Sequence, residues 1–120
     1  MSQWKTLYNH LSSEGFSVYS PGQHAGECLS PYVVLRYSGT SPVSTFTSTQ
    51  DRYELLCYVP KDQYSTLLEY RDSVKEAMRG LYPTFVLTGY ETAAYYDDSV
   101  KAHMVSVEYR NSVKNKPNFV

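Results

Sequence analysis

The chain has 120 residues, enough for one domain, and its 11 Lys and Arg residues against 12 Asp and Glu residues give a net charge of -1. This balance lacks the basic excess with which nucleic-acid-binding proteins neutralise phosphates, so a generic DNA or RNA binder is not expected. The first residues, MSQWKTLYNHL, contain no uninterrupted apolar run and no cleavage-site pattern. We therefore expect a soluble, cytosolic chain without an export signal or a membrane span.

The first predicted element is a short amphipathic helix. Ser2 is placed to cap its start and Gly15 to end it. Residues 16–19 predict a brief strand, and Pro21-Gly22 and then Gly26 predict a connection rich in turns. The apolar residues of the helix follow the spacing of one helical face: Trp4, Leu7, Tyr8 and Leu11.

The middle of the chain predicts two strands with a loop between them. Residues 31–37, PYVVLRY, are β-branched and aromatic, which is typical of a strand. Residues 38–50 carry no charge and consist mostly of Ser, Thr, Gly and Pro, which predicts a long loop. Residues 52–59, RYELLCYV, alternate between an apolar face with Tyr53 and Leu55 and a mixed face with Glu54, which predicts a half-buried strand.

A long helix is predicted next, over residues 64–81. Asp62 is placed to cap its start and Gly80 to close it. One stripe of this helix is expected to face the sheet: Tyr64, Leu67, Leu68, Arg71, Val74, Met78 and Leu81.

The last third predicts an antiparallel hairpin. Residues 84–98 and 100–110 read as two strands joined at Asp97-Asp98-Ser99. Residues 111–120 are polar and basic with an apolar tip, so they are expected to form either a frayed tail or an arm that docks on a neighbour. The expected fold is thus a single α+β domain over residues 1–110, with a mostly antiparallel sheet of about four strands packed by one long helix and a short N-terminal helix.

One long helix covers only one face of such a sheet. The second face is then either covered by a partner or exposed to water, as antiparallel sheets allow. The 13 tyrosines suit both alternatives, because a tyrosine buries a large ring and keeps a hydroxyl available.

The cysteines and histidines do not form a recognisable metal or cofactor site. Cys28 and Cys57 lack a CxxC spacing and lie in strand-like surroundings, so we expect two buried, reduced thiols. His10, His24 and His103 fall on different elements without metal-ligand spacing, so no metal and no cofactor is predicted.

No catalytic motif is present either. The sequence contains no phosphate-binding glycine loop and no GxSxG nucleophile elbow, and adjacent carboxylates at Asp97-Asp98 are typical of a turn. We therefore expect a protein that is not an enzyme. The alternative is a small enzyme or ligand-binding domain in which His103, Asp97 and a tyrosine converge in a pocket.

In three stretches, residues 26–37, 53–60 and 95–111, the chain resembles the tail-terminator proteins of tailed bacteriophages. These proteins are also described as tail-completion, minor capsid or head-tail joining proteins. The resemblance implies a mixed α/β structural subunit that forms a ring, usually a hexamer, on the last ring of the tail tube. Its partners would be the tail tube protein and the head-tail connector or stopper protein.

The resemblance further implies a place in the tail or neck of the virion, reached by assembly in the cytoplasm of a host bacterium. DNA would pass through the lumen of the ring without specific binding. A head-completion or connector-stopper protein of the same particle is the alternative within this class.

The interface of such a ring is expected to involve the charge-free loop, exposed tyrosines, and an acidic turn facing a basic patch of the neighbour. Each of these residues also has a simpler interpretation as solvated surface. The residues are Ser41, Pro42, Val43 and Phe46 of the loop, the tyrosines Tyr53, Tyr58, Tyr95 and Tyr96, the acidic Asp97 and Asp98, and the basic Arg110, Lys114 and Lys116.

Overall fold

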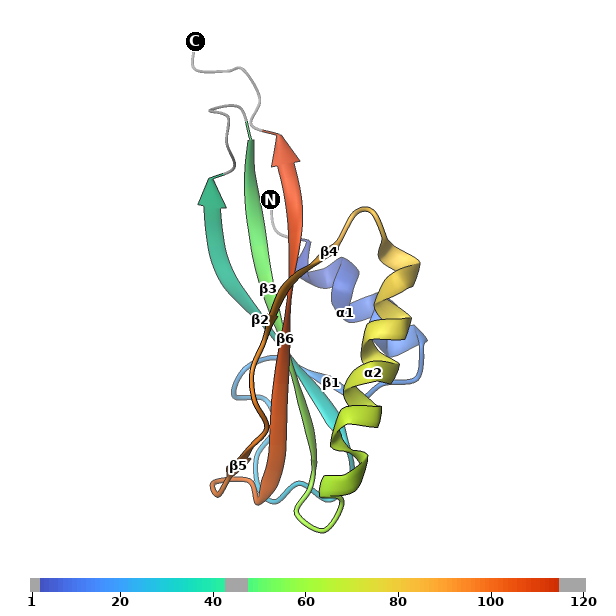
Figure 1. The fold of residues 1–120 in the computed structure, drawn as a ribbon, viewed down its shortest axis with the longest axis vertical. Helices are drawn as coiled ribbons and strands as arrows, with labels where there is room; N and C mark the ends of the chain where they lie inside the picture. Colours follow the sequence, from blue (N-terminus) through green and yellow to red (C-terminus); the bar gives the residue numbers. More distant parts are fainter. Residues whose placement is uncertain (1–2, 43–47, 115–120) are drawn as a thin grey trace.

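A twisted sheet carries two helices on the same face (Figure 1). The computed structural model describes residues 3–42 and 48–114. The molecule is elongated, with extents of 56 × 26 × 24 Å, because three strands project as an arm beyond the helices (Figure 1). The elements in chain order are α1 (Trp4–Ser13), β1 (Val18–Tyr19), β2 (Tyr32–Pro42), β3 (Ser48–Pro60), α2 (Leu67–Met78), β4 (Val86–Glu91), β5 (Tyr95–Asp97) and β6 (Ala102–Lys114).

The sheet has the strand order β1-β2-β3-β6-β4, and β5 pairs with β6. Strand β1 is parallel to β2, whereas all other neighbours are antiparallel. The prediction of about four strands in a mostly antiparallel sheet with one long helix is therefore wrong: six strands form a mixed sheet, and two helices pack on it. Strands β1 and β5 are only 2 and 3 residues long, too short for periodicity to reveal.

The expected single strand over residues 84–98 is divided into β4 and β5. The pairing of β4 with β6 shifts between Leu87 and Glu91, and Gly89 lies within the shift with a φ of 95°. A glycine adopts this left-handed conformation without the steric cost that a Cβ would bring. The bulge bends the edge of the sheet and ends regular pairing there.

The predicted loop over residues 38–50 is largely strand. Strand β2 continues to Pro42 and β3 begins at Ser48, while residues 43–47 lie outside the described residues. These polar residues form strands because β3 pairs on both sides, with β2 and with β6. The pairing provides partners for the backbone N–H and C=O groups, and it does not depend on the type of side chain. Residues 111–114 of the predicted tail continue β6, and residues 115–120 lie outside the described residues.

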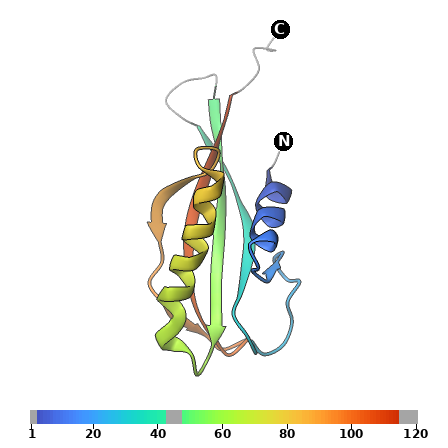
Figure 2. The ribbon, with the colours of Figure 1, turned by 90° about the vertical axis from the view of Figure 1, so that its right-hand side faces the viewer.

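The main core lies between the sheet and the two helices, on what we call the helix face (Figure 2). Leu7 and Leu11 of α1 are fully buried there, which confirms the predicted stripe of the first helix. Two short 3-10 turns flank α2, so the helical region spans residues 64–81 as predicted, but only its middle is α-helix. The central residues of the sheet complete this core: Val33, Leu35, Tyr53, Leu55, Cys57, Val59, Val105, Val107 and Tyr109.

The predicted stripe of the second helix is only partly correct. Val74 and Met78 are buried, but Tyr64 and Leu68 are exposed, although Leu67 between them is buried. Tyr64 and Leu68 are four residues apart and therefore lie on one side of the helix, outside the strip that Leu67, Val74 and Met78 bury. Asp62 does not cap the helix: the residue before the first 3-10 turn is Gln63, and its side chain makes no capping hydrogen bond.

Candidate oligomerisation interface

The sheet face opposite the helices, which we call the open face, is occupied by paired charges over much of its area. Arg36 contacts Glu54 at 2.8 Å on β2 and β3, and Ser106 of β6 donates a hydrogen bond to the same carboxylate at 3.0 Å. Arg52 contacts Glu108 at 2.7 Å, and the Thr88 hydroxyl donates to Glu108 at 2.9 Å. The central open face therefore offers a polar surface whose charges largely neutralise one another.

One end of the open face is covered by the chain itself. Residues 20–31 fold over it, and His24 stacks on Tyr32 with ring centroids 4.1 Å apart. Tyr32 in turn stacks on Tyr58 at 4.9 Å, and Cys28, Ala102 and Met104 complete this smaller core. At this end, neither of the two alternatives for the second face applies, because the chain itself covers the sheet. Only the central and arm regions of the open face lack cover from the described residues.

Burial of tyrosines predicts a loss of stability in alkaline solution. Removal from water raises the pKa of Tyr58 and of Tyr109 to about 12 in each case, and it raises the pKa of Tyr32 and of Tyr70 as well. An unfolded tyrosine ionises near a pKa of about 10, so near and above that pH the unfolded state binds fewer protons than the folded state. We expect the urea midpoint to fall as the pH rises through about 10 and to keep falling to about pH 12.

The Tyr109→Phe variant tests this origin, because it removes one of the buried tyrosine hydroxyls whose pKa is raised. Its urea midpoint should fall less steeply above pH 10 than that of the wild-type protein. Tyr82→Phe, at an exposed position, is the matched control and should leave the slope unchanged. Equal slopes in all three proteins would contradict the prediction.

Two edges of the sheet remain unpaired among the described residues. Strand β1 pairs only with Val33 and Val34 of β2, and the Trp4 indole donates to the Leu35 carbonyl at 2.9 Å. Beyond that point, no described strand pairs with the outer edge of β2. Strand β4 is last in the sheet order, and its outer edge likewise pairs with no described strand. Such edges readily pair with another chain.

The two unpaired edges lie at the same level of the sheet. One row of paired residues crosses it from edge to edge in the order Leu87, Tyr109, Tyr53, Tyr37. The neighbouring row runs Val86, Arg110, Arg52, Gly39. Strand β4 also runs opposite to β2, because the strands alternate in direction from β2 through β3 and β6 to β4.

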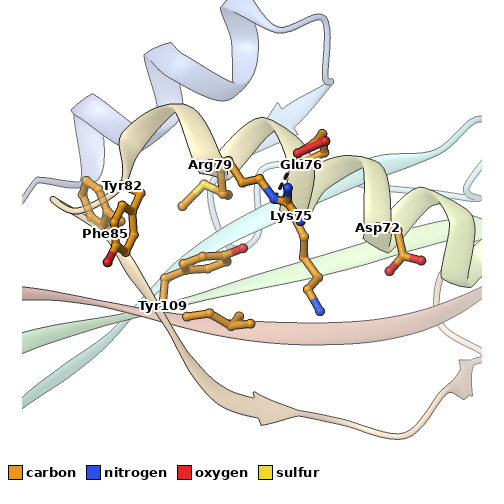
Figure 3. A pocket seen from close by; sticks show the side chains of 9 residues that line it. Asp72, Lys75, Glu76, Arg79, Tyr82, Phe85 and Tyr109 are labelled. Carbon is orange, nitrogen blue, oxygen red and sulfur yellow. Dashed lines mark ion pairs between the residues drawn. The ribbon is translucent and has the colours of Figure 1, made fainter.

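A pocket of about 570 Å³ lies on the helix face beside β4, between that strand and α2 (Figure 3). We call it the α2–β4 pocket. Its floor is apolar and consists of Met78, Phe85, Leu87 and Tyr109. Tyr82 lies next to Phe85 at one end, and α2 supplies a charged rim of Asp72, Lys75, Glu76 and Arg79, in which Arg79 and Glu76 are paired at 3.1 Å.

The structure distributes the predicted interface residues over both ends of the sheet. Tyr95 and Tyr96 are exposed as predicted, Asp97 is the last residue of β5, and Asp98 begins the turn between β5 and β6. Ser41 lies on β2 in the arm, beside Gln50 of β3.

The basic residues lie at the other end of β6 from the acidic turn. Asp97 pairs with Ala102 at the start of β6, whereas Arg110 and Lys114 lie near its end. The acidic turn and the basic residues are therefore too far apart to meet within one protomer. Of the remaining predicted residues, Pro42 belongs to β2, and Val43, Phe46 and Lys116 lie outside the described residues.

The interpretation of Tyr53 and Tyr58 as exposed is wrong. Tyr53 is fully buried in the main core, where its ring centroid lies 5.7 Å from that of Phe85. Its hydroxyl oxygen accepts a hydrogen bond from the Gln3 backbone N–H at 2.8 Å. Tyr58 is buried in the smaller core. Tyr37, which the sequence analysis did not select, is the half-exposed tyrosine at the unpaired edge of β2. A tyrosine inside a predicted strand gives no signal that distinguishes an edge from the centre.

The residues of the alternative catalytic site do not converge. Tyr96 pairs with His103, and Asp97 pairs with Ala102, so His103 and Asp97 project from opposite faces of the sheet. His103 packs between Tyr64 and Tyr96 and donates through Nε2 to the Lys61 carbonyl at 3.1 Å. Asp97 accepts hydrogen bonds from the Ser99 amide and hydroxyl, as expected of a turn residue.

His10 and the two cysteines contribute to the packing of the fold. His10 donates to the Ala77 carbonyl at 2.7 Å and so joins α1 to α2. Cys28 and Cys57 are buried and unpaired as predicted, and burial raises the pKa of both thiols, that of Cys57 to about 12. Within residues 3–42 and 48–114, no group of three His, Cys, Asp or Glu side chains could hold a metal ion.

No family model matches the sequence, and no curated protein matches it significantly. Neither described helix has the length and apolar character needed to cross a bilayer.

Proposed function

We propose that this protein is a structural subunit that acts by self-association into a closed ring, and that the ring is the tail terminator of a tailed bacteriophage. The observation that carries the proposal is the pair of unpaired edges on β2 and β4, which lie at the same level of one sheet. The particular identity as a tail terminator rests on the sequence resemblance.

The edges are suited to cyclic assembly for a geometric reason. A rotation about an axis along the strands preserves strand direction, so β2 of one copy would meet β4 of the next in antiparallel orientation. Because the edges are level, this pairing needs no shift along the axis. A heterologous contact without such a shift closes into a ring instead of extending as a filament.

The size of the ring is compatible with a DNA channel. Strands β2, β3, β6 and β4 of six copies, spaced at about 4.8 Å, would form a closed sheet about 115 Å around and about 37 Å across. With the helices outside, the open face would line the channel. Its ion pairs Arg36–Glu54 and Arg52–Glu108 suit a surface past which DNA slides without being held by its phosphates.

In this proposal the ring caps the tail tube protein and offers its other side to the head-tail connector or stopper protein. It works in the virion neck without catalysis, after assembly in the bacterial cytoplasm. The acidic turn at Asp97-Asp98 and the basic end of β6 lie at opposite ends of the subunit, so they would face different partners along the ring axis.

Light scattering over a wide concentration range, combined with electron microscopy, tests the ring. We expect a closed assembly of identical copies whose population grows with concentration. A protein that stays monomeric at every concentration would contradict the proposal.

A second measurement separates the terminator from a head-completion or connector-stopper protein. Purified tails and purified heads are each sedimented with the labelled protein. A terminator is expected to sediment with tails, and binding only to heads would favour the stopper instead.

A further inference from the structure

Tyr37 lies where a neighbouring copy would meet it. It projects from the helix face at the unpaired edge of β2, with its ring 5.4 Å from that of Tyr53 and its hydroxyl donating to Asp51 at 3.1 Å. Its side chain is 43% exposed, although both contacts hold it in one orientation. A half-exposed aromatic ring that is already oriented loses little entropy when a partner covers it.

The α2–β4 pocket lies at the opposite edge, on the same face and at the same level. Its floor residue Leu87 belongs to the same row of paired residues as Tyr37. Helix α2 reaches β4 through the ion pairs of Arg71 and Lys75 with Glu91, and the apolar floor of the pocket lies between α2 and the part of β4 that contains Leu87 (Figure 3).

We infer that the α2–β4 pocket of each protomer binds Tyr37 of the next protomer in the ring. This inference rests on the proposed self-association and specifies its contact. When β2 of a second copy adds to β4 without a shift along the strands, the row that ends at Leu87 continues with the Tyr37 of that copy. Directly opposed side chains in an antiparallel pair have Cβ atoms about 4.5–5.5 Å apart, so the tyrosine ring reaches the pocket floor.

The chemistry of the pocket matches a tyrosine. Met78, Phe85, Leu87 and Tyr109 provide an apolar surface for the exposed side of the ring, while the Tyr37 hydroxyl keeps its hydrogen bond to Asp51 of its own copy. The same arrangement brings α1 of the second copy beside α2, because α1 covers the β2 side of the helix face (Figure 2). The apolar floor of the pocket thereby becomes covered. A second copy is thus the occupant that both the pocket and the register favour.

The experiment is cysteine cross-linking with a short bismaleimide. The double variant Tyr37→Cys/Leu87→Cys should give a ladder of covalent species up to the size of the ring, at a protein concentration raised to the level at which Tyr37→Ala assembles. A mixture of the two single variants should stop at dimers, since each copy then carries one introduced thiol. The native Cys28 and Cys57 are buried, so the wild-type protein should not cross-link.

A control pair of cysteines and two substitutions of Tyr37 complete the test. Leu29→Cys/Leu87→Cys introduces an exposed thiol on the connection over the opposite face and should give no ladder. Tyr37→Ala should weaken assembly by about 30-fold per contact, the effect of losing an interface anchor, whereas Tyr37→Phe should assemble nearly as the wild type does.

The outcomes distinguish the inference from the proposal on which it rests. If the wild-type protein assembles, but Tyr37→Cys/Leu87→Cys gives no ladder and Tyr37→Ala assembles normally, the pocket assignment is overturned and the ring stands. If the wild-type protein does not assemble at any concentration, both are overturned.

Discussion

Replacing Leu55 with alanine is expected to lower the free energy of unfolding by about 2–5 kcal/mol. Leu55 is fully buried on β3, at the centre of the sheet, and pairs with Leu35 on one side and Val107 on the other. The alanine would lose the transfer free energy of the leucine side chain and leave a cavity between two strands and the helices. Urea denaturation followed by circular dichroism measures this loss.

The matched control is Leu68→Ala on α2. Leu68 is a leucine that the sequence predicts to face the sheet, but it is 51% exposed. We expect its replacement to change the free energy of unfolding by no more than about 0.5 kcal/mol. Similar losses at both positions would show that the packing of the sheet and helices is not as described.

Replacing Arg52 with alanine is expected to lower the free energy of unfolding more than replacing Arg36 does, because it leaves the largely buried carboxylate of Glu108 without the guanidinium that pairs with it. Arg52 donates to Glu108 through Nε at 3.2 Å and Nη2 at 2.7 Å, and the Glu108 side chain is only 12% exposed. Thr88 remains as a hydrogen-bond donor, but it cannot neutralise the charge. Urea denaturation of the variant measures this cost.

The matched control is Arg36→Ala on the same face. Arg36 pairs with Glu54 at the similar distance of 2.8 Å, but the two side chains are 55% and 23% exposed. Water therefore screens this pair, and its loss should cost no more than about 1 kcal/mol. The double variant Arg52→Ala/Glu108→Ala should recover part of the stability lost in Arg52→Ala, and a further loss of similar size would contradict the assigned pairing.

The variants at Arg36 and Arg52 also bear on assembly. Arg36 and Arg52 lie on the open face, away from the helix-face contact inferred for Tyr37. We therefore expect their replacement to leave ring formation largely intact. A defect in assembly without a loss of stability would place the open face in a subunit contact instead of in the channel.

Features that depend on local physics could be predicted from the amino-acid pattern alone. The apolar spacing of Trp4 to Leu11 gave the first helix, since a helix brings residues three and four apart onto one face. The alternation of residues 52–59 gave the strongest strand, since successive side chains of a strand point to opposite faces. The burial of Cys28 and Cys57 followed from their apolar neighbours in the same way.

Which strands are neighbours, and which side chains they cover, depends on contacts between distant parts of the chain. The two residues of β1 form a strand because β2 lies beside them, and Gly89 divides one predicted strand in two because β6 fixes its pairing. Tyr53 is buried and Tyr37 is half-exposed although both lie in tyrosine-rich strands, because β3 is central and β2 is at an edge. The level row that joins Leu87 to Tyr37 is formed by pairing between residues far apart in the chain, so no local pattern contains it.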